Sequence, residues 1–151
     1  MDQIRSSSLP DGRLWITEIN SVSRRVFRTH EITYNLNLAL KPISSRRQLE
    51  AATYRHIPFR DGKTGQQVQT QFDQAVTTLL RRLRETDDRV VVNCGAGVSR
   101  SAAVAATVVA VREDLSFQQA LTDVSHARPT VDPYESLREY GTAYVRDRPD
   151  R

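Results

Sequence analysis

Cysteine is nearly absent from this 151-residue sequence, which contains only Cys94. With one cysteine no disulfide can form within the chain, so a disulfide-stabilised scaffold and a zinc site built on several cysteines are both excluded. Long apolar runs are absent too: none approaches the ~20 residues that span a bilayer, and residues 1–12 lack the apolar core of a signal peptide. We therefore expect a cytoplasmic protein without a membrane span.

Acidic residues are slightly outnumbered, with 18 Asp and Glu against 22 Lys and Arg and a formal net charge of +4. The positive charge favours anionic partners, although 38% hydrophobic and 26% charged residues describe an ordinary globular chain. We expect no specific binding of nucleic acid. The length suits one domain over residues 1–151, with polar tails at 1–13 and 146–151, and we expect a monomer.

Strand and helix patterns alternate along the chain. Short strands are predicted over residues 13–19, 32–40, 52–59 and 89–94. Apolar and polar residues alternate over 32–40, which predicts a strand with one buried face. The continuous apolar run at 90–92 is instead typical of a strand buried on both faces of a parallel sheet.

Helices are predicted over residues 21–30, 67–85, 101–113, 116–128 and 132–145. Ser116 and Gln119 have capping-box spacing, and Asp132 is the predicted N-cap of the last helix, with Glu135 three residues later. The alternation predicts a single α/β domain with a mostly parallel sheet of about four to five strands, flanked by helices on both faces. In such folds ligands bind at the carboxyl ends of the strands.

Cys94 lies at such a strand end, within the sequence VNCGAGVSRSAA. Gly95 and Gly97 allow successive backbone N–H groups to turn inward and form a nest for an anion. The N-terminus of the next helix adds positive potential, and the Arg100 guanidinium can hold two phosphate oxygens. The same positive field favours the thiolate form of Cys94.

A thiolate at the base of a phosphate-binding nest is a nucleophilic phosphatase site, in which a cysteinyl-phosphate forms and water then releases phosphate. Ser101 can donate a hydrogen bond to the departing thiolate. This chemistry needs no cofactor, and we predict no metal site. The residues expected to bind the phosphate are Gly95, Ala96, Gly97, Val98, Ser99 and Arg100.

The Cys-x5-Arg loop after a buried strand, in VVVNCGAGVSRSAAVAA, resembles the signature of the cysteine-dependent protein tyrosine phosphatase superfamily and its dual-specificity branch. The resemblance extends over about residues 32–144, including ARPTVDPYESLREY near the C-terminus. It implies hydrolysis of phosphotyrosine, and of phosphoserine or phosphothreonine, on a phosphorylated protein substrate. It also implies a general-acid aspartate after an "IP" strand, which in YRHIPFRDG is Asp61.

Other carboxylates are available for the general-acid role, namely Asp73, Asp87 and Asp88. Asp73 belongs to the predicted helix 67–85, and the other two belong to the turn after it, so Asp61 is the better candidate.

One departure from the family pattern precedes the nucleophile, because Asn93 replaces the usual histidine. We expect Asn93 to support the catalytic loop by hydrogen bonds to the loop backbone. The substitution leaves open an alternative, a phosphate-binding module with weak or no turnover. Phosphoinositide, nucleotide and RNA 5′-phosphate substrates also stay open, although the loop lacks the lysines of relatives that act on inositol phospholipids. A rhodanese-like sulfurtransferase fits the Ser-Arg-Ser sequence less well.

Overall fold

The computed structural model describes residues 1–62 and 64–148. The strands are β1 (Asp2–Gln3), β2 (Leu14–Glu18), β3 (Tyr34–Asn37), β4 (Thr53–His56) and β5 (Val90–Cys94). The helices are α1 (Arg24–Thr29), α2 (Gln66–Glu85), α3 (Arg100–Glu113), α4 (Phe117–Ala127) and α5 (Glu135–Asp147), with 3-10 turns η1 (Ile19–Ser21) and η2 (Ser45–Arg47). No helix in these two ranges is both long and apolar enough to cross a membrane.

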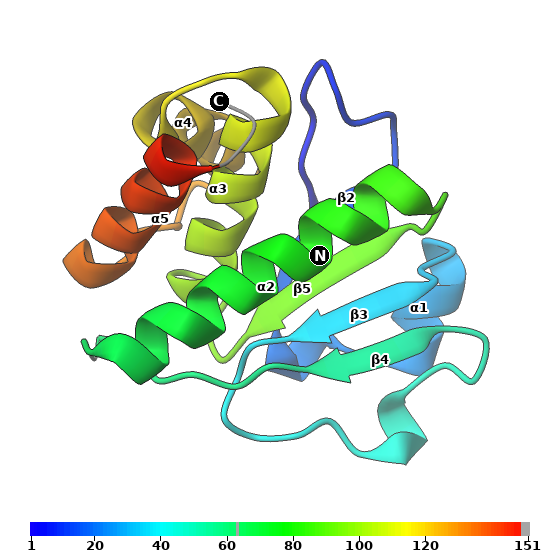
Figure 1. Cartoon of the computed structure of the whole chain (residues 1–151). Coiled ribbons are helices and arrows are strands. Elements are labelled where there is room, and N and C mark those ends of the chain that lie inside the picture. The colour runs from blue at the N-terminus through cyan, green and yellow to red at the C-terminus, as the bar shows by residue number, and fades with distance from the viewer. Residues whose placement is uncertain (63, 149–151) are drawn as a thin grey trace.

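One five-stranded sheet forms the centre of the molecule, with the strand order β1-β2-β5-β3-β4 (Figure 1). The strands from β2 to β4 in this order are parallel, and β1 pairs with β2 in the antiparallel direction. The predicted α/β class is therefore confirmed. β5 is the middle strand, so its carboxyl end, where Cys94 lies, is surrounded by the loops of its neighbours.

Two apolar clusters hold helices to the two faces of the sheet. The larger one joins α2, α3, α4 and α5 to one face, and α3 lies at its centre with every residue from 101 to 110 buried. The smaller one joins α1 to the other face through Phe27, Trp15 and Val91. The near-continuous apolar sequence of α3 follows from this position, because neighbouring elements surround that helix.

The prediction of one buried face for the strand at 32–40 was wrong. All four residues of β3 are buried, including Asn35 and Asn37. The helix α2 covers one face of this strand, and the connection from β3 to β4 covers the other. On that second face Asn35 donates to Asn93 Oδ1, and Asn37 donates to Lys41 O. The alternating polar residues of this strand therefore lie on a buried face, where they form hydrogen bonds, and not on an exposed face.

Residues 1–13 were predicted to be a polar tail, and this was wrong as well. β1 pairs with β2, and Ile4 and Leu9 are buried in the larger cluster. The intervening serines hydrogen-bond to Glu113 of α3, with Ser7 Oγ at 2.9 Å and Ser8 Oγ at 2.7 Å. Although burial raises it, the nearby Ser6 hydroxyl and the hydrogen bonds from Ser8 and Ser7 lower the pKa of Glu113 to about 2. The serine hydroxyl groups had suggested a tail exposed to solvent, but they attach residues 1–13 to α3.

The two ends of the last helix also depart from prediction. Its N-cap is Tyr134 and not Asp132, whose carboxylate instead accepts a hydrogen bond from Arg138 at 2.8 Å. The helix continues to Asp147, so the predicted tail at 146–151 begins too early, and residues 149–151 lie outside the described residues. The capping box of Ser116 and Gln119, by contrast, is confirmed at the start of α4.

Candidate active site

Cys94 is the last residue of β5, and a five-residue loop, 95–99, connects it to the first turn of α3. The thiol is buried, with 1% of the residue exposed, and its Sγ lies 3.3 Å from the hydroxyl of Ser101. Gly97 has φ of +69°, and a Cβ there would lie 2.9 Å from the backbone of Thr17 and Glu18. The loop therefore passes too close to the end of β2 for any side chain at position 97.

Neighbouring segments fix the loop through its carbonyl groups. Ile19 N donates to Gly95 O at 3.2 Å, and Asp132 N donates to Val98 O at 2.8 Å. The described residues offer no acceptor to the backbone N–H groups of residues 95–99. With the carbonyls directed outward to partners and the N–H groups left without one, the loop has the arrangement of an anion-binding nest.

A third carbonyl contact ties the loop to the N-terminal strand. Arg128 donates to Ala96 O at 3.2 Å, to Glu18 Oε2 at 2.6 Å and to Asp2 Oδ2 at 2.8 Å. Hydrogen bonds from Ser21 and Arg128 lower the pKa of Glu18 below its ordinary value. Arg128 thus joins β1, β2 and the loop around one largely buried guanidinium.

Arg100 begins α3 and lies against the loop. Its Nη1 donates to Phe59 O at 3.0 Å, and its Nε is buried without a hydrogen-bond partner. A Cβ at Gly95 would lie 3.1 Å from Arg100 Nη2, so the guanidinium packs directly on the glycine. One edge of the guanidinium is therefore held by the protein, and no described residue accepts a hydrogen bond from the edge formed by Nε and Nη2.

Asp61 lies 33 positions before Cys94, and the fold brings it to the same loop. Its Oδ1 accepts a hydrogen bond from Ser99 Oγ at 2.8 Å, and its Oδ2 lies 3.9 Å from Arg100 Nε. Ser99 Oγ in turn accepts from Tyr134 N at 3.1 Å. The side chain of Ser99 therefore holds the Asp61 loop. Only the backbone N–H group of Ser99 can contribute to the nest.

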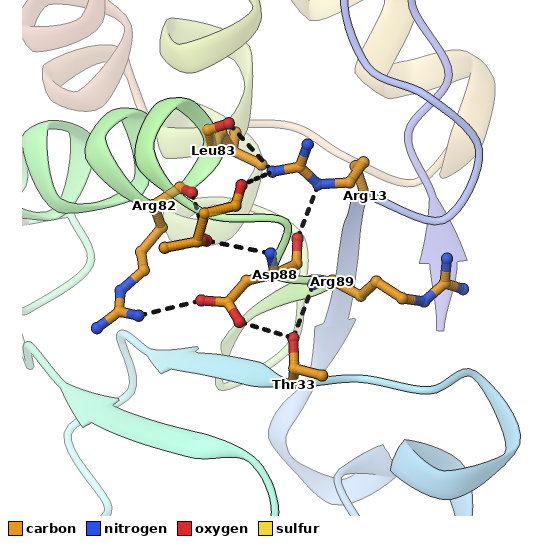
Figure 2. Close-up of polar contacts among 7 residues, drawn as sticks. Arg13, Thr33, Arg82, Leu83, Asp88 and Arg89 are labelled. Carbon is orange, nitrogen blue, oxygen red and sulfur yellow. Dashed lines mark hydrogen bonds and ion pairs between the residues drawn. The ribbon is translucent and has the colours of Figure 1, made fainter.

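The rival carboxylates lie elsewhere. Asp88 accepts hydrogen bonds from Thr33 at 2.9 Å and Arg82 at 3.0 Å, as Figure 2 shows. Burial raises its pKa, but these two hydrogen bonds and one from Thr86 lower it overall. Asp73 lies on α2 beside α5, where burial raises its pKa. Neither of these carboxylates lines the cleft beside Cys94.

We predicted hydrogen bonds from Asn93 to the loop backbone, and this was wrong. Its Nδ2 donates to Asn37 Oδ1 at 2.8 Å, and its Oδ1 accepts from Asn35 Nδ2 at 2.9 Å, so the amide points sideways across β3. Asn37 in turn accepts from Ala39 N at 3.0 Å and donates to Lys41 O at 3.0 Å. Asn93 is thus connected through Asn37 to residues 39–41.

A cleft of about 330 Å³ opens beside the loop. It is lined by Ile19, Ala39, Leu40, Lys41, Arg60, Asp61, Gly95 and Arg100. No local pattern marks Ile19 or residues 39–41 as site residues, because they come from loops that only the sheet topology brings to this edge. Leu40 is 47% exposed, which is unusual for a large apolar residue in this molecule. Among the residues described, no cluster of three His, Cys, Asp or Glu side chains could hold a metal.

Known proteins resemble this chain in sequence. The sequence profile of the family described as "Dual specificity phosphatase, catalytic domain" matches residues 14–142. Mouse "Dual specificity protein phosphatase 19" is 30% identical over 119 residues, which is 76% of this chain and 52% of that protein. The chain thus spans about half the length of this curated relative.

Solved structures share the fold. Human DUSP28 superimposes with a TM-score of 0.80 at 16% identity, covering 97% of this chain and 96% of that chain. PTPMT1 in complex with PI(5)P superimposes with a TM-score of 0.72 at 16% identity, covering 91% and 92%. With the family profile matching most of the sequence, the chain belongs to the dual-specificity phosphatase catalytic-domain family.

Proposed function

We propose that this chain is a protein phosphatase that hydrolyses phosphotyrosine, and also phosphoserine or phosphothreonine, through a cysteinyl-phosphate intermediate. One observation carries the proposal: Cys94, Arg100 and Asp61 converge on a loop whose N–H groups lack partners among the described residues. Membership of the family supports it, as does the name of the mouse relative.

The first chemical step forms a bond between Cys94 Sγ and phosphorus and breaks the bond between phosphorus and the leaving oxygen. The N–H groups of the loop and the free edge of Arg100 hold the phosphate oxygens as charge moves onto them. Asp61, at 3.9 Å from Arg100 Nε, is placed to protonate the leaving oxygen.

In the second step Asp61 acts as the base and Cys94 is the leaving group. Water attacks phosphorus and gives a proton to the Asp61 carboxylate, and the electron pair of the S–P bond returns to sulfur. Ser101 Oγ, at 3.3 Å from Cys94 Sγ, donates a hydrogen bond that stabilises the departing thiolate. Inorganic phosphate and the free enzyme result.

The walls of the cleft suit a phosphorylated side chain on a protein. Ile19 and Leu40 offer apolar contacts for a phenol ring or an aliphatic stem, and Lys41 and Arg60 place cations at the entrance. Since Cys94 is buried, the phosphate has to enter the cleft to be attacked, and a phosphotyrosine side chain is long enough to reach into it. We infer that phosphotyrosine is the better substrate.

Initial rates on an aryl phosphate and on matched phosphotyrosine, phosphoserine and phosphothreonine peptides test the proposal. We expect turnover of all of them, fastest for phosphotyrosine, and none by Cys94→Ser. The variant should still bind vanadate, because the nest consists of backbone N–H groups and Arg100. A wild-type protein that binds vanadate but releases no phosphate would establish the binding-module alternative.

A phosphoinositide is the second candidate substrate, on the strength of the likeness to the PTPMT1 structure and of the cations Lys41 and Arg60 at the entrance. Rates on a phosphoinositide in mixed micelles distinguish the two. A kcat/KM above that for every phosphopeptide would assign the lipid as the substrate class.

A further inference from the structure

β4 is an edge strand, and no strand among residues 1–62 and 64–148 pairs with its outer side. Figure 1 shows this strand at one side of the sheet, next to β3. Thr53 N donates to Thr33 O at 2.8 Å and Ile57 N donates to Asn37 O at 2.9 Å, both toward β3. Because backbone groups alternate in direction along a strand, those of Tyr54 and His56 point away from β3.

The connection from β3 to β4 contacts this strand through side chains. It packs on the side chains of β4, where Ile43 N donates to the Tyr54 hydroxyl at 3.1 Å and His56 Nε2 donates to Ala39 O at 2.6 Å. These contacts lie on the face opposite α2. No hydrogen bond joins any described part of that connection to the outward backbone groups of Tyr54 and His56.

A cleft of about 570 Å³ adjoins the same edge on the face that α2 covers. Thr53 and Arg55 border it on the strand side, and Thr77, Thr78 and Arg81 border it on the helix side. It shares no lining residue with the catalytic cleft. Hydroxyl and guanidinium donors therefore face an open strand edge at a second site.

The cleft is positively charged after its internal ion pairs are considered. Asp88 holds Arg82 (Figure 2), and the Arg82 guanidinium also stacks over the Tyr34 ring at 4.5 Å. Glu85 pairs with Arg84 at 3.2 Å. Arg55 and Arg81 form no hydrogen bond or ion pair within the described residues, and both are exposed. Two cations are thus left to attract an anionic ligand.

We propose that an extended acidic peptide segment of a protein partner adds as a further strand beside β4. Its backbone would pair with Tyr54 and His56, which gives affinity, and every second side chain would face the cleft. Carboxylates at those alternate positions meet Arg55 and Arg81, which gives specificity. The open backbone edge favours a peptide over a nucleic acid, because the Tyr34 ring is covered by Arg82 and leaves no free stacking surface in the cleft.

This edge leads to the active site. The chain runs from Arg55 to Arg60 in five residues, at most about 18 Å of extended backbone, and Arg60 lines the catalytic cleft. On the proposed phosphatase function, an acidic segment about six residues from the phosphorylated residue would occupy both sites at once. Docking would then raise the effective concentration of the substrate at Cys94.

Binding is tested first without catalysis, using Cys94→Ser protein and a fluorescent unphosphorylated peptide with alternating glutamates. We expect salt-sensitive binding that weakens at least about tenfold in both Arg55→Glu and Arg81→Glu. Arg25→Glu is the matched control, since Arg25 is an exposed arginine of α1 on the opposite face of the sheet, and it should bind like the parent. Equal affinity in Arg55→Glu and the parent would overturn the proposal.

Strand addition is tested with a peptide of the same charge in which proline replaces two alternate residues. Loss of binding supports backbone pairing, because proline lacks the N–H group that the edge needs. Unchanged binding, or equally tight binding of a single-stranded oligonucleotide, would mean a general polyanion patch and would refute the strand.

Catalysis is measured separately. Arg55→Glu should lower kcat/KM for a phosphopeptide that carries the acidic segment and leave the rate on an aryl phosphate unchanged. An acidic peptide that binds through Arg55 to a protein inactive on every phosphopeptide would refute the phosphatase function and leave the docking site standing.

Discussion

At the scale of single residues, the chemistry depends on which edge of each polar group the protein already uses. Arg100 donates Nη1 to Phe59 O, and its Nε has no hydrogen-bond partner among the described residues, so phosphate can bind without displacing the hydrogen bond that orients the side chain. Asp61 is held by Ser99, which is itself held by the backbone of Tyr134. On the proposed mechanism, the groups for phosphate binding and proton transfer are therefore oriented before substrate arrives.

Replacing Asp61 with Asn should remove the proton donor and keep the hydrogen bond from Ser99. We expect hydrolysis of alkyl phosphates, which have poor leaving groups, to fall by about 10²- to 10⁴-fold. Hydrolysis of nitrophenyl phosphate should fall much less, because its leaving group needs little protonation. Initial rates on both substrates measure this, with Asp73→Asn as the control. Equal losses on the two substrates would exclude Asp61 as the acid.

Asn93 should act through Asn37, because the two amides are bonded at 2.8 Å. Asn93→Ala leaves buried amide groups unpaired, so we expect a loss of about 1–3 kcal/mol in the free energy of unfolding. We also expect a lower kcat and a changed pH dependence of Cys94 alkylation by iodoacetamide. The exposed Asn20→Ala is the control.

A double-mutant cycle with Asn37→Ala decides whether the two asparagines act together. Coupling should appear in both the free energy of unfolding and the alkylation profile. Strictly additive effects would mean that Asn93 contributes to packing alone.

At the scale of elements, the N-terminal segment shows how side chains can attach a short strand that would not hold by itself. β1 has two residues, and the serines after it bond to Glu113 on α3. The folded-state pKa of Glu113, about 2, lies below its ordinary value of 4.5. Its contribution to stability is therefore complete above pH 4.5 and is lost as the pH falls toward 2.

Glu113→Gln should lower the melting temperature near pH 7 and make it less sensitive to acid between pH 4.5 and 2. Thermal melts across that range measure the effect. Glu50→Gln, at an exposed glutamate, should keep the acid sensitivity of the wild type. Parallel melting curves for Glu113→Gln and the wild type would show that the serines do not anchor the segment through this carboxylate.

At the scale of the whole molecule, the features predicted correctly are those that depend only on residues close together in the sequence. The apolar run of β5 and the capping box of α4 specify their own conformations, and they were predicted correctly. Residues 39–41 enter the catalytic cleft only through sheet topology, so no local pattern marks them. The predicted hydrogen bonds from Asn93 to the loop backbone were wrong, because its amide bonds to two asparagines that lie 58 and 56 residues earlier in the sequence.

The single cysteine also predicts how the molecule responds to oxidants. Mild peroxide should inactivate the enzyme by converting the Cys94 thiolate to a sulfenic acid, which an external thiol can reduce. With no second cysteine in the chain to form a protective disulfide, stronger treatment should give the irreversible sulfinic acid. Mass spectrometry of peroxide-treated protein measures both products. An unmodified Cys94 in inactivated protein would locate the sensitive group elsewhere.

Arg128 connects the first residues of the chain to the catalytic loop, and this matters for the design of expression vectors. The guanidinium that holds Ala96 O in the catalytic loop is neutralised partly by Asp2, in a strand of only two residues. An affinity tag fused immediately before residue 1 would crowd that strand and change the electrostatic balance at the loop. Kinetic constants measured on such a fusion would then describe the tag's position as much as the enzyme, so an expression vector that leaves the amino end unencumbered is the sounder choice.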